Sequence, residues 1–358
     1  SGRPVENPEA RYADGKTFVL YPSQQGAHNI QTMSFNPGTG LAYIPVLEFG
    51  MPFVDPPDGL DNWTPKPNWV LNGGVGSAAG VRFDPPISGL LAWNPATQQE
   101  IWRKSGWPGM FHGGTITTAG NLVFQGRADG SFFAYAADSG KELWATPLGY
   151  TKLDGGGDTG APGNAGGDGP RSTPTVDGNR VYVLSAGLVL FCMDARNGKT
   201  LWKKELIKEH GAKNITWQNA ASALLEGDLL FVCAGGSGQS LLCFHKAAGA
   251  LVWKGQSDAM THATPISATI LGHRQIIFFT QSGLVSVVPG TGDVLWRYSF
   301  PYRTSTAASP VVGGDIVFCS AGYGVGAGAV KITKEGDKFK ATEIWRKSNQ
   351  LINHWSSS

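Results

Sequence analysis

The sequence predicts an all-β protein on three observations. First, 50 of its 358 residues are glycine and 22 are proline, which are residues that favour turns. Second, charged residues make up only 16% of the chain, and apolar residues with helical spacing are nearly absent. Third, short apolar runs that end in tryptophan recur along the chain, as expected of repeated sheet units. The 41% of hydrophobic residues supply a core and exclude a disordered chain.

The recurring unit has the length and turn chemistry of four β-strands. Its tryptophans lie 42 to 58 residues apart, close to the roughly 40–50 residues of one β-propeller blade. Tight turns such as Asp177-Gly178 and Glu226-Gly227 join the preceding strands. We therefore predict a single β-propeller of four-stranded blades, six by repeat count, or seven if residues 16–22 and 351–358 add strands. The tryptophans expected to pack between blades are Trp102, Trp144, Trp202, Trp253, Trp296 and Trp345.

Two long loops interrupt the repeats. Residues 48–87 lie inside the first repeat, and such a loop can be a binding lid or simply a cap. Residues 147–171 are rich in glycine, and their aspartates have calcium-binding chemistry, but the spacing matches no EF-hand and favours a plain loop. Because open sheet edges invite aggregation, we expect one terminus to complete a blade of the other, or two copies to pair as a homodimer. The aspartates are Asp154, Asp158 and Asp168.

Composition excludes several classes of partner. The net charge of +2 gives no general attraction to nucleic acid or to an anionic membrane. No run of 18 apolar residues occurs, so we expect no transmembrane segment, and the first residues lack the pattern of a signal peptide. The cysteines lie in apolar, strand-like runs without metal-binding spacing, which favours buried free thiols. They are Cys192, Cys233, Cys243 and Cys319.

The repeats resemble a known family. Asp194 and Gly198, which precede Trp202, match the tryptophan-docking motif of pyrroloquinoline-quinone (PQQ) repeat propellers. Residues 1–146 resemble the C-terminal blades of quinoprotein (PQQ-dependent) alcohol dehydrogenases, on the segments 6–12, 26–29, 33–37 and 118–126. Residues from about 150 to 358 resemble BamB-like PQQ-repeat propellers, on the segments 167–174 and 321–328. We therefore interpret the chain as one propeller domain that joins two fragments near residues 146–150, with BamB-like blades over 172–358, whether by a natural or an engineered event.

The dehydrogenase resemblance implies a PQQ cofactor, Ca²⁺ and an extracytoplasmic, periplasmic location. It places Asn29 where the family contacts the quinone, but Ile30 stands where a tryptophan usually follows. The calcium-binding acids, the catalytic base and the adjacent cysteine pair of that family belong to blades that this chain does not match. We therefore expect an incomplete quinone site with neither PQQ nor calcium.

Candidate site residues cluster where the first strand of each blade begins, because propellers place function at the central channel. Aligning the repeats brings His112, Arg171 and His262 to one position, and it places His28 or Asn29 there in the first repeat. Imidazoles suit Zn²⁺ or Mn²⁺, and Arg171 could hold an anion. Alternatively, the histidines fill a polar channel through hydrogen bonds and water. The candidate metal ligands are His28, His112, His262 and His354, and the candidate substrate-binding residues are Asn29, Arg171, Asn219 and Trp355.

Three functions remain open at this point. The first is a propeller that binds a small molecule or a protein at one face through a histidine-lined channel. The second is a metal-dependent hydrolase of an ester or phosphoester that uses those histidines. The third is a residual PQQ-dependent alcohol dehydrogenase. If the protein is an enzyme, the residues favour the hydrolase over the dehydrogenase.

Overall fold

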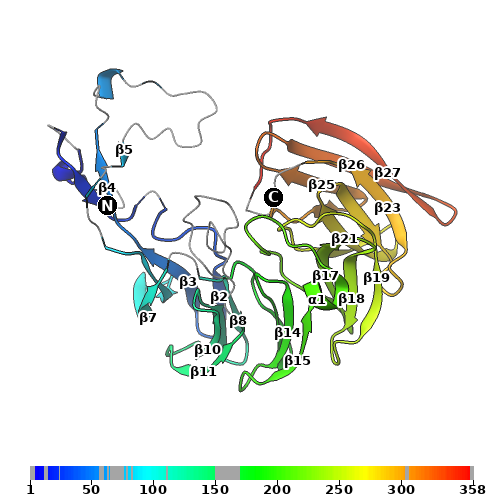
Figure 1. Ribbon diagram of the computed structural model, residues 1–358, viewed down its shortest axis with the longest axis horizontal. Coiled ribbons are helices and arrows are strands. Elements are labelled where there is room, and N and C mark those ends of the chain that lie inside the picture. Colours follow the sequence, from blue (N-terminus) through cyan, green and yellow to red (C-terminus); the bar gives the residue numbers. More distant parts are fainter. Residues whose placement is uncertain are drawn as a thin grey trace.

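A computed structural model gives the architecture and describes residues 5–11, 15–23, 25–55, 60–62, 64, 76–77, 80–81, 84–109, 112–149, 170–302 and 306–354. Within them, six four-stranded antiparallel sheets follow one another along the chain. Figure 1 shows these sheets arranged as blades in an arc, with the first and last blades at its two ends. The predicted all-β propeller of six four-stranded blades is confirmed.

Blades 1 to 3 lie between residues 34 and 205. Blade 1 contains β2 (Ser34–Asn36), β3 (Leu41–Glu48), β6 (Ile87–Asn94) and β7 (Gln99–Pro108). Blade 2 contains β8 (Thr115–Thr118), β9 (Leu122–Gly126), β10 (Ser131–Ala136) and β11 (Glu142–Pro147). Blade 3 contains β12 (Thr175–Asp177), β13 (Arg180–Leu184), β14 (Val189–Asp194) and β15 (Thr200–Glu205).

Blades 4 to 6 repeat the same strand order. Blade 4 contains β16 (Leu224–Glu226), β17 (Leu229–Gly236), β18 (Gln239–His245) and β19 (Leu251–Gly255). Blade 5 contains β20 (Ile266–Ile270), β21 (His273–Thr280), β22 (Gly283–Val287) and β23 (Val294–Ser299). Blade 6 contains β24 (Val311–Gly313), β25 (Ile316–Ala321), β26 (Gly326–Glu335) and β27 (Lys338–Lys347). Each blade is built from consecutive strands, apart from the insertion in blade 1. The expectation that one terminus completes a blade formed by the other is therefore wrong for these six blades.

A smaller sheet accompanies blade 1. It pairs β1 (Phe18–Leu20) with β4 (Met51–Val54), and β4 with β5 (Gly76–Ser77). The loop over residues 48–87 therefore supplies two strands of a three-stranded sheet rather than a seventh four-stranded blade. The helical elements are short: η1 (Pro8–Arg11), η3 (Leu60–Asn62) and α1 (Leu206–His210). No helix in the described ranges has the length and apolar character needed to cross a membrane.

The blades have buried middle strands and exposed outer strands. In β13 and β17 nearly every side chain is buried, because both faces of a blade pack against neighbouring blades, and their sequences are accordingly continuous apolar runs. The outer strand β7 buries only its tryptophan, Trp102. The four cysteines are buried and free, which confirms their prediction, and burial raises the pKa of the Cys233 thiol to about 12.

Four tryptophans dock each blade onto the next, as the repeats predict. Each indole N–H donates to a backbone carbonyl of the next blade, seven residues before that blade's own tryptophan. Each indole ring also lies against a glycine with positive φ in the next blade, four residues before that blade's tryptophan. The bonds are Trp102 to Ala137 (3.0 Å), Trp144 to Ala195 (3.0 Å), Trp202 to Lys246 (3.2 Å) and Trp253 to Pro289 (2.7 Å). The glycines are Gly140, Gly198, Gly249 and Gly292.

The contact between blades 5 and 6 is built differently. The hairpin β26–β27 is longer than its counterparts, so the docking turn is not repeated there. Trp296 donates instead to the side-chain oxygen of Gln275 within its own blade (2.7 Å). The Tyr298 hydroxyl donates to Glu343 of β27 (2.8 Å) and ties the two blades together.

Candidate functional site

Three of the predicted residues lie near enough to one another for Arg171 and His354 to influence the pKa of His262. Arg171 precedes β12, His262 precedes β20 and His354 follows β27. Arg171 and His354 both contribute to the lowered pKa of His262, so these residues from three different parts of the chain are electrostatically coupled. We call these three residues the channel-mouth cluster.

His262 is the half-buried histidine of the channel-mouth cluster that precedes β20. Its ring Nε2 lies 2.7 Å from the carbonyl oxygen of Gln218; a carbonyl only accepts, so Nε2 carries the proton and donates it. Its backbone N–H donates to Thr306 (3.0 Å). Burial lowers the pKa of His262 to about 4, and Arg171 contributes in the same direction. The ring is therefore neutral at pH 7.

His354 makes a ring contact and a backbone hydrogen bond. Its ring stands edge-to-face against Tyr323, with the centroids 4.7 Å apart, and its carbonyl accepts the N–H of Ala307 (2.8 Å). A Cβ on Gly322 would lie 2.7 Å from its Nδ1, so the close approach requires glycine. Burial lowers the pKa of His354. Arg171 is thus the permanent cation of the channel-mouth cluster.

Other predicted residues are engaged elsewhere. His28 Nδ1 donates to Pro45 O (2.7 Å), and the Asn29 amide donates to Gln25 in its own loop (2.8 Å to the carbonyl). Asn219 is fully buried. Its side-chain amide donates to the carbonyl of Ala221 and accepts the N–H of the same residue. Nothing in these contacts supports the predicted ligand roles of Asn29 and Asn219. Trp355 and the aspartates of the glycine-rich loop lie outside the described residues.

His112 lies in a separate environment. It is 3% exposed, and its ring packs against Trp107 (centroids 5.4 Å apart). Its Nδ1 accepts the N–H of Ala128 (3.3 Å). Burial lowers the pKa of His112 to about 4, and the charges that act on it are those of Arg127 and Asp129 rather than those of the channel-mouth cluster. The repeat alignment placed His112 and His262 at one position, but the fold does not bring their side chains together.

Arg127 is a feature that the sequence reasoning missed. Its guanidinium lies over the rings of Trp107 (3.9 Å to the centroid) and Phe133 (3.4 Å), and it donates to the Tyr135 hydroxyl (2.5 Å). Arginine on aromatic faces contributes about 0.5–2 kcal/mol per contact. The aromatic spacing Phe133-x-Tyr135 on one strand face was the available signal.

The histidines do not form a metal centre in the part of the chain that the structure describes. There, no three His, Cys, Asp or Glu side chains are grouped so that they could hold a metal ion. The separate positions of His28 and His112 explain this, because each ring is engaged in its own blade. The Zn²⁺ or Mn²⁺ site on His28, His112, His262 and His354 therefore stays a prediction that the arrangement does not support.

Hydroxyl side chains link the inner strands around the channel. The N–H of Thr173 donates to Ser222 Oγ (3.0 Å), and the N–H of Ser222 donates to Thr264 Oγ1 (2.9 Å). Ser309 Oγ donates to the Thr264 carbonyl (2.8 Å), and Thr173 Oγ1 donates to Thr32 Oγ1 (3.2 Å). The belt joins blades 1, 3, 4, 5 and 6, and it fixes the positions of the loops that carry Arg171 and His262.

Replacing Ser222 with alanine tests this belt. We expect the Ser222→Ala variant to lose about 1–2 kcal/mol in free energy of unfolding, because the Thr173 N–H loses its acceptor. Urea unfolding measures the loss, with Ser139→Ala, on an exposed turn, as the control. Equal stability of the two variants would contradict a structural role for the belt.

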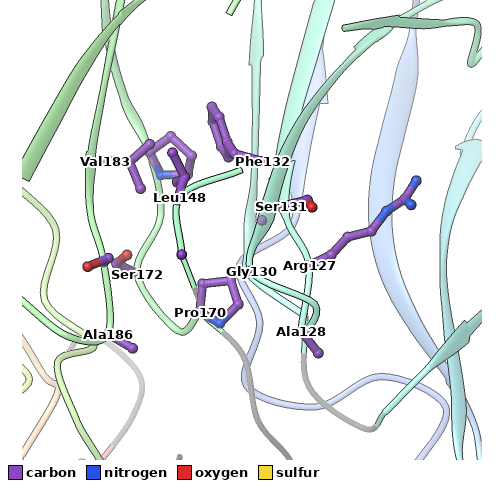
Figure 2. A pocket seen from close by; sticks show the side chains of 14 residues that line it. Arg127, Ala128, Gly130, Ser131, Phe132, Leu148, Pro170, Ser172, Val183 and Ala186 are labelled. Carbon is purple, nitrogen blue, oxygen red and sulfur yellow. The ribbon is translucent and has the colours of Figure 1, made fainter. Parts of the chain in front are cut away.

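A small apolar cavity lies between blades 2 and 3. Its volume is about 40 Å³, and Phe132, Leu148, Pro170 and Val183 line it. Figure 2 shows the Arg127 side chain extending away from it. A ligand pocket for a drug-sized molecule takes roughly 300–1,000 Å³, so this cavity is a packing gap. The Pro170 ring closes over Gly126, where a Cβ would lie 2.6 Å from it.

Two kinds of known protein are similar to this chain. Over 144 residues the chain is 46% identical to quinohemoprotein alcohol dehydrogenase ADH IIB of Pseudomonas putida, which covers 40% of this chain and 20% of that protein. Over 161 residues it is 39% identical to 1-butanol dehydrogenase (cytochrome c) of Thauera butanivorans, which covers 42% of this chain and 22% of that protein. The chain thus spans about a fifth of the length of these curated relatives.

The likeness of fold extends further along the chain. The crystal structure of BamB from Moraxella catarrhalis superposes with a TM-score of 0.51 at 16% identity, over 74% of this chain and 72% of that one. A protein family described as outer membrane protein assembly factor BamB matches residues 53–154, 87–205 and 153–355. The matched ranges cover well over half of the sequence, and the strand order and tryptophan docking agree with them. The chain belongs to this BamB family of PQQ-repeat propellers.

Proposed function

We propose that this protein is an extracytoplasmic binding propeller whose channel-mouth cluster holds an anionic group of a small molecule or of a partner protein. The observation that carries the proposal is the convergence of Arg171, His262 and His354. Arg171 supplies a permanent charge beside two histidines whose pKa values burial lowers. An arginine fork suits a carboxylate or phosphate oxygen pair. The description of the matching family, an outer membrane protein assembly factor, supports the proposed location.

A simple dicarboxylate, succinate, is a suitable probe for this cluster. We expect it to raise the thermal unfolding midpoint of the protein, because a ligand that binds only the folded state stabilises it. Arg171→Gln should weaken the apparent affinity at least about tenfold, since a charged hydrogen bond contributes about 1.5–3 kcal/mol. Arg196→Gln is the matched control, because Arg196 is exposed and pairs with Asp194 (2.8 Å). Equal responses of the two variants, or no response of the native protein, would reject the proposal.

The same preparation distinguishes the two enzymatic alternatives. A metal-dependent hydrolase requires bound Zn²⁺ or Mn²⁺ that is lost on His262→Ala, and metal analysis measures this directly. A dehydrogenase is favoured by the identity to the two alcohol dehydrogenases, and it requires dye reduction by alcohols after addition of PQQ and Ca²⁺. The residues do not fit the quinone, because Asn29 donates its amide hydrogens to Gln25 and Ile30 is exposed beside it. We therefore derive no step through PQQ.

A further inference from the structure

A much larger cavity lies beside β12 and β16, the first strands of blades 3 and 4. Its volume is about 750 Å³, within the range of roughly 300–1,000 Å³ that pockets for drug-sized ligands occupy. The cavity is open to solvent, so a ligand can enter it while every blade stays folded. Arg171, His262 and His354 are not among the described residues that line it. It is therefore a candidate site distinct from the channel-mouth cluster.

Four hydroxyl side chains lie together in the lining of this cavity. The Thr173 hydroxyl donates to Thr32 Oγ1 (3.2 Å), and the N–H of Thr173 donates to Ser222 Oγ (3.0 Å). The N–H of Ser222 donates in turn to Thr264 Oγ1 (2.9 Å). Within the described part of the chain, the hydroxyls of Thr32, Ser222 and Thr264 only accept. Because each hydroxyl also carries one hydrogen, these three O–H groups remain available to a ligand in the cavity.

The two charged side chains of the lining neutralise each other. Lys246 Nζ lies 2.7 Å from Asp177 Oδ2, and both residues line the cavity. Asp228 also approaches this ammonium group (3.6 Å), but its side chain is 76% exposed and lies outside the lining. A charged ligand therefore meets no uncompensated opposite charge in this wall. An uncharged ligand with hydroxyl groups meets both a donor and an acceptor in the pair.

The rest of the wall is mainly aliphatic. Val176 lies between Thr175 and Asp177 on β12, and Leu224 and Leu225 belong to β16. None of the described residues that line the cavity is aromatic. A planar quinone or nucleobase would therefore find no ring on which to stack. Aliphatic side chains suit the C–H groups of a saturated molecule instead.

We propose that this cavity binds an uncharged saccharide of about disaccharide size. Its oxygens accept hydrogen bonds from Thr32, Ser222 and Thr264, and its C–H groups pack on Leu224 and Leu225. Three observations combine in the proposal: the O–H donors that the protein leaves available, the absence of net charge in the lining and the saturated walls. The site is independent of the anion proposed for the channel-mouth cluster.

Maltose is the probe, and isothermal titration calorimetry is the measurement, because sugars stabilise proteins by exclusion from their surface even where they do not bind. We expect saturable binding to the native protein. Thr32→Val keeps the shape of the side chain but removes its O–H, so the affinity should fall about two- to tenfold. Thr32 is exposed and its hydroxyl accepts only that of Thr173, so the variant folds. Thr200→Val, the same change at an exposed position of β15, is the control and should bind as the native protein does.

Methyl signals of the native protein locate the bound sugar. Maltose should shift the ¹³C-methyl signals of Val176 and Leu225 but not those of Leu190, which is fully buried in the core. Absence of saturable binding, equal affinities of Thr32→Val and Thr200→Val, or unshifted Val176 and Leu225 signals would each overturn the proposal.

Succinate separates this inference from the proposed function. A saturating concentration of succinate should leave the affinity for maltose unchanged, because the two ligands occupy different sites. Competition between them would place maltose at the channel-mouth cluster and would overturn the inference. Saturable binding of maltose by a protein that does not respond to succinate would support the inference and reject the proposed function alone.

Discussion

Replacing Gly198 with alanine is expected to lower the free energy of unfolding by about 3 kcal/mol, which is the sum of two effects. Gly198 has φ +72°, and a side chain in this left-handed region costs about 1–2 kcal/mol. The added Cβ would also lie 2.5 Å from the ring of Trp144, and overpacking of this kind costs about 1–3 kcal/mol. The ring cannot retreat freely, because its N–H is bonded to Ala195. Urea unfolding followed by circular dichroism measures the loss.

Gly178→Ala separates the two contributions. Gly178 also has positive φ (+55°), but nothing lies within 4 Å of the Cβ that alanine would add. The Gly178→Ala variant should therefore lose only the backbone contribution, about 1–2 kcal/mol. If both variants lost the same amount, the tryptophan docking would contribute nothing to the requirement for glycine at position 198. A larger loss for Gly178→Ala would contradict the packing argument altogether.

The blade architecture could be predicted from the sequence because it is local. The docking tryptophan and the glycine four residues before it recur at fixed positions, as at Trp202 and Gly198. Every blade except the interrupted blade 1 is a contiguous segment, so only one pairing across an insertion had to be inferred. The small sheet was not predictable in this way. Its strand β1 pairs with β4, which lies inside the insertion of blade 1. A pairing between two irregular segments leaves no periodic signal in either one.

The candidate site was predicted only in part, for a geometric reason. Alignment of the repeats gives the position along a strand, but it does not give the direction of the side chain. It grouped Arg171 with His262, and the charge of Arg171 does contribute to the lowered pKa of His262, but their shared role stays a prediction. It also grouped His112, which turns into a separate buried environment beside Trp107. Since two neighbouring rotamers can aim one imidazole at different neighbours, the sequence pattern alone could not separate these cases. The seam near residues 146–150 stays a prediction.

Acidification is expected to destabilise the protein between pH 6.5 and about 4. The pKa values of His112 and His262 lie at about 4 in the folded protein, mainly because both rings are buried, whereas an unfolded histidine has a pKa near 6.5. In this window the unfolded chain binds more protons than the folded one, so stability falls with the pH. Each histidine contributes about 3 kcal/mol to this loss. Below about pH 4 both states are protonated, and these two residues cause no further loss.

The slope of stability against pH assigns this loss to the two rings. We measure the free energy of unfolding of His262→Gln and His112→Gln in urea between pH 7 and pH 4. In each variant the free energy of unfolding should fall less steeply with pH than in the native protein, because glutamine does not titrate. Each substitution should remove about half of the pH-dependent loss that the two histidines cause together. His245→Gln is the control, since His245 is exposed on the outer part of blade 4, and its slope should match that of the native protein. An unchanged slope in both buried variants would mean that these imidazoles are hydrated or charged in the folded state. The channel-mouth cluster would then carry more positive charge at neutral pH than Arg171 alone supplies, and succinate binding would strengthen on acidification instead of being lost with the fold.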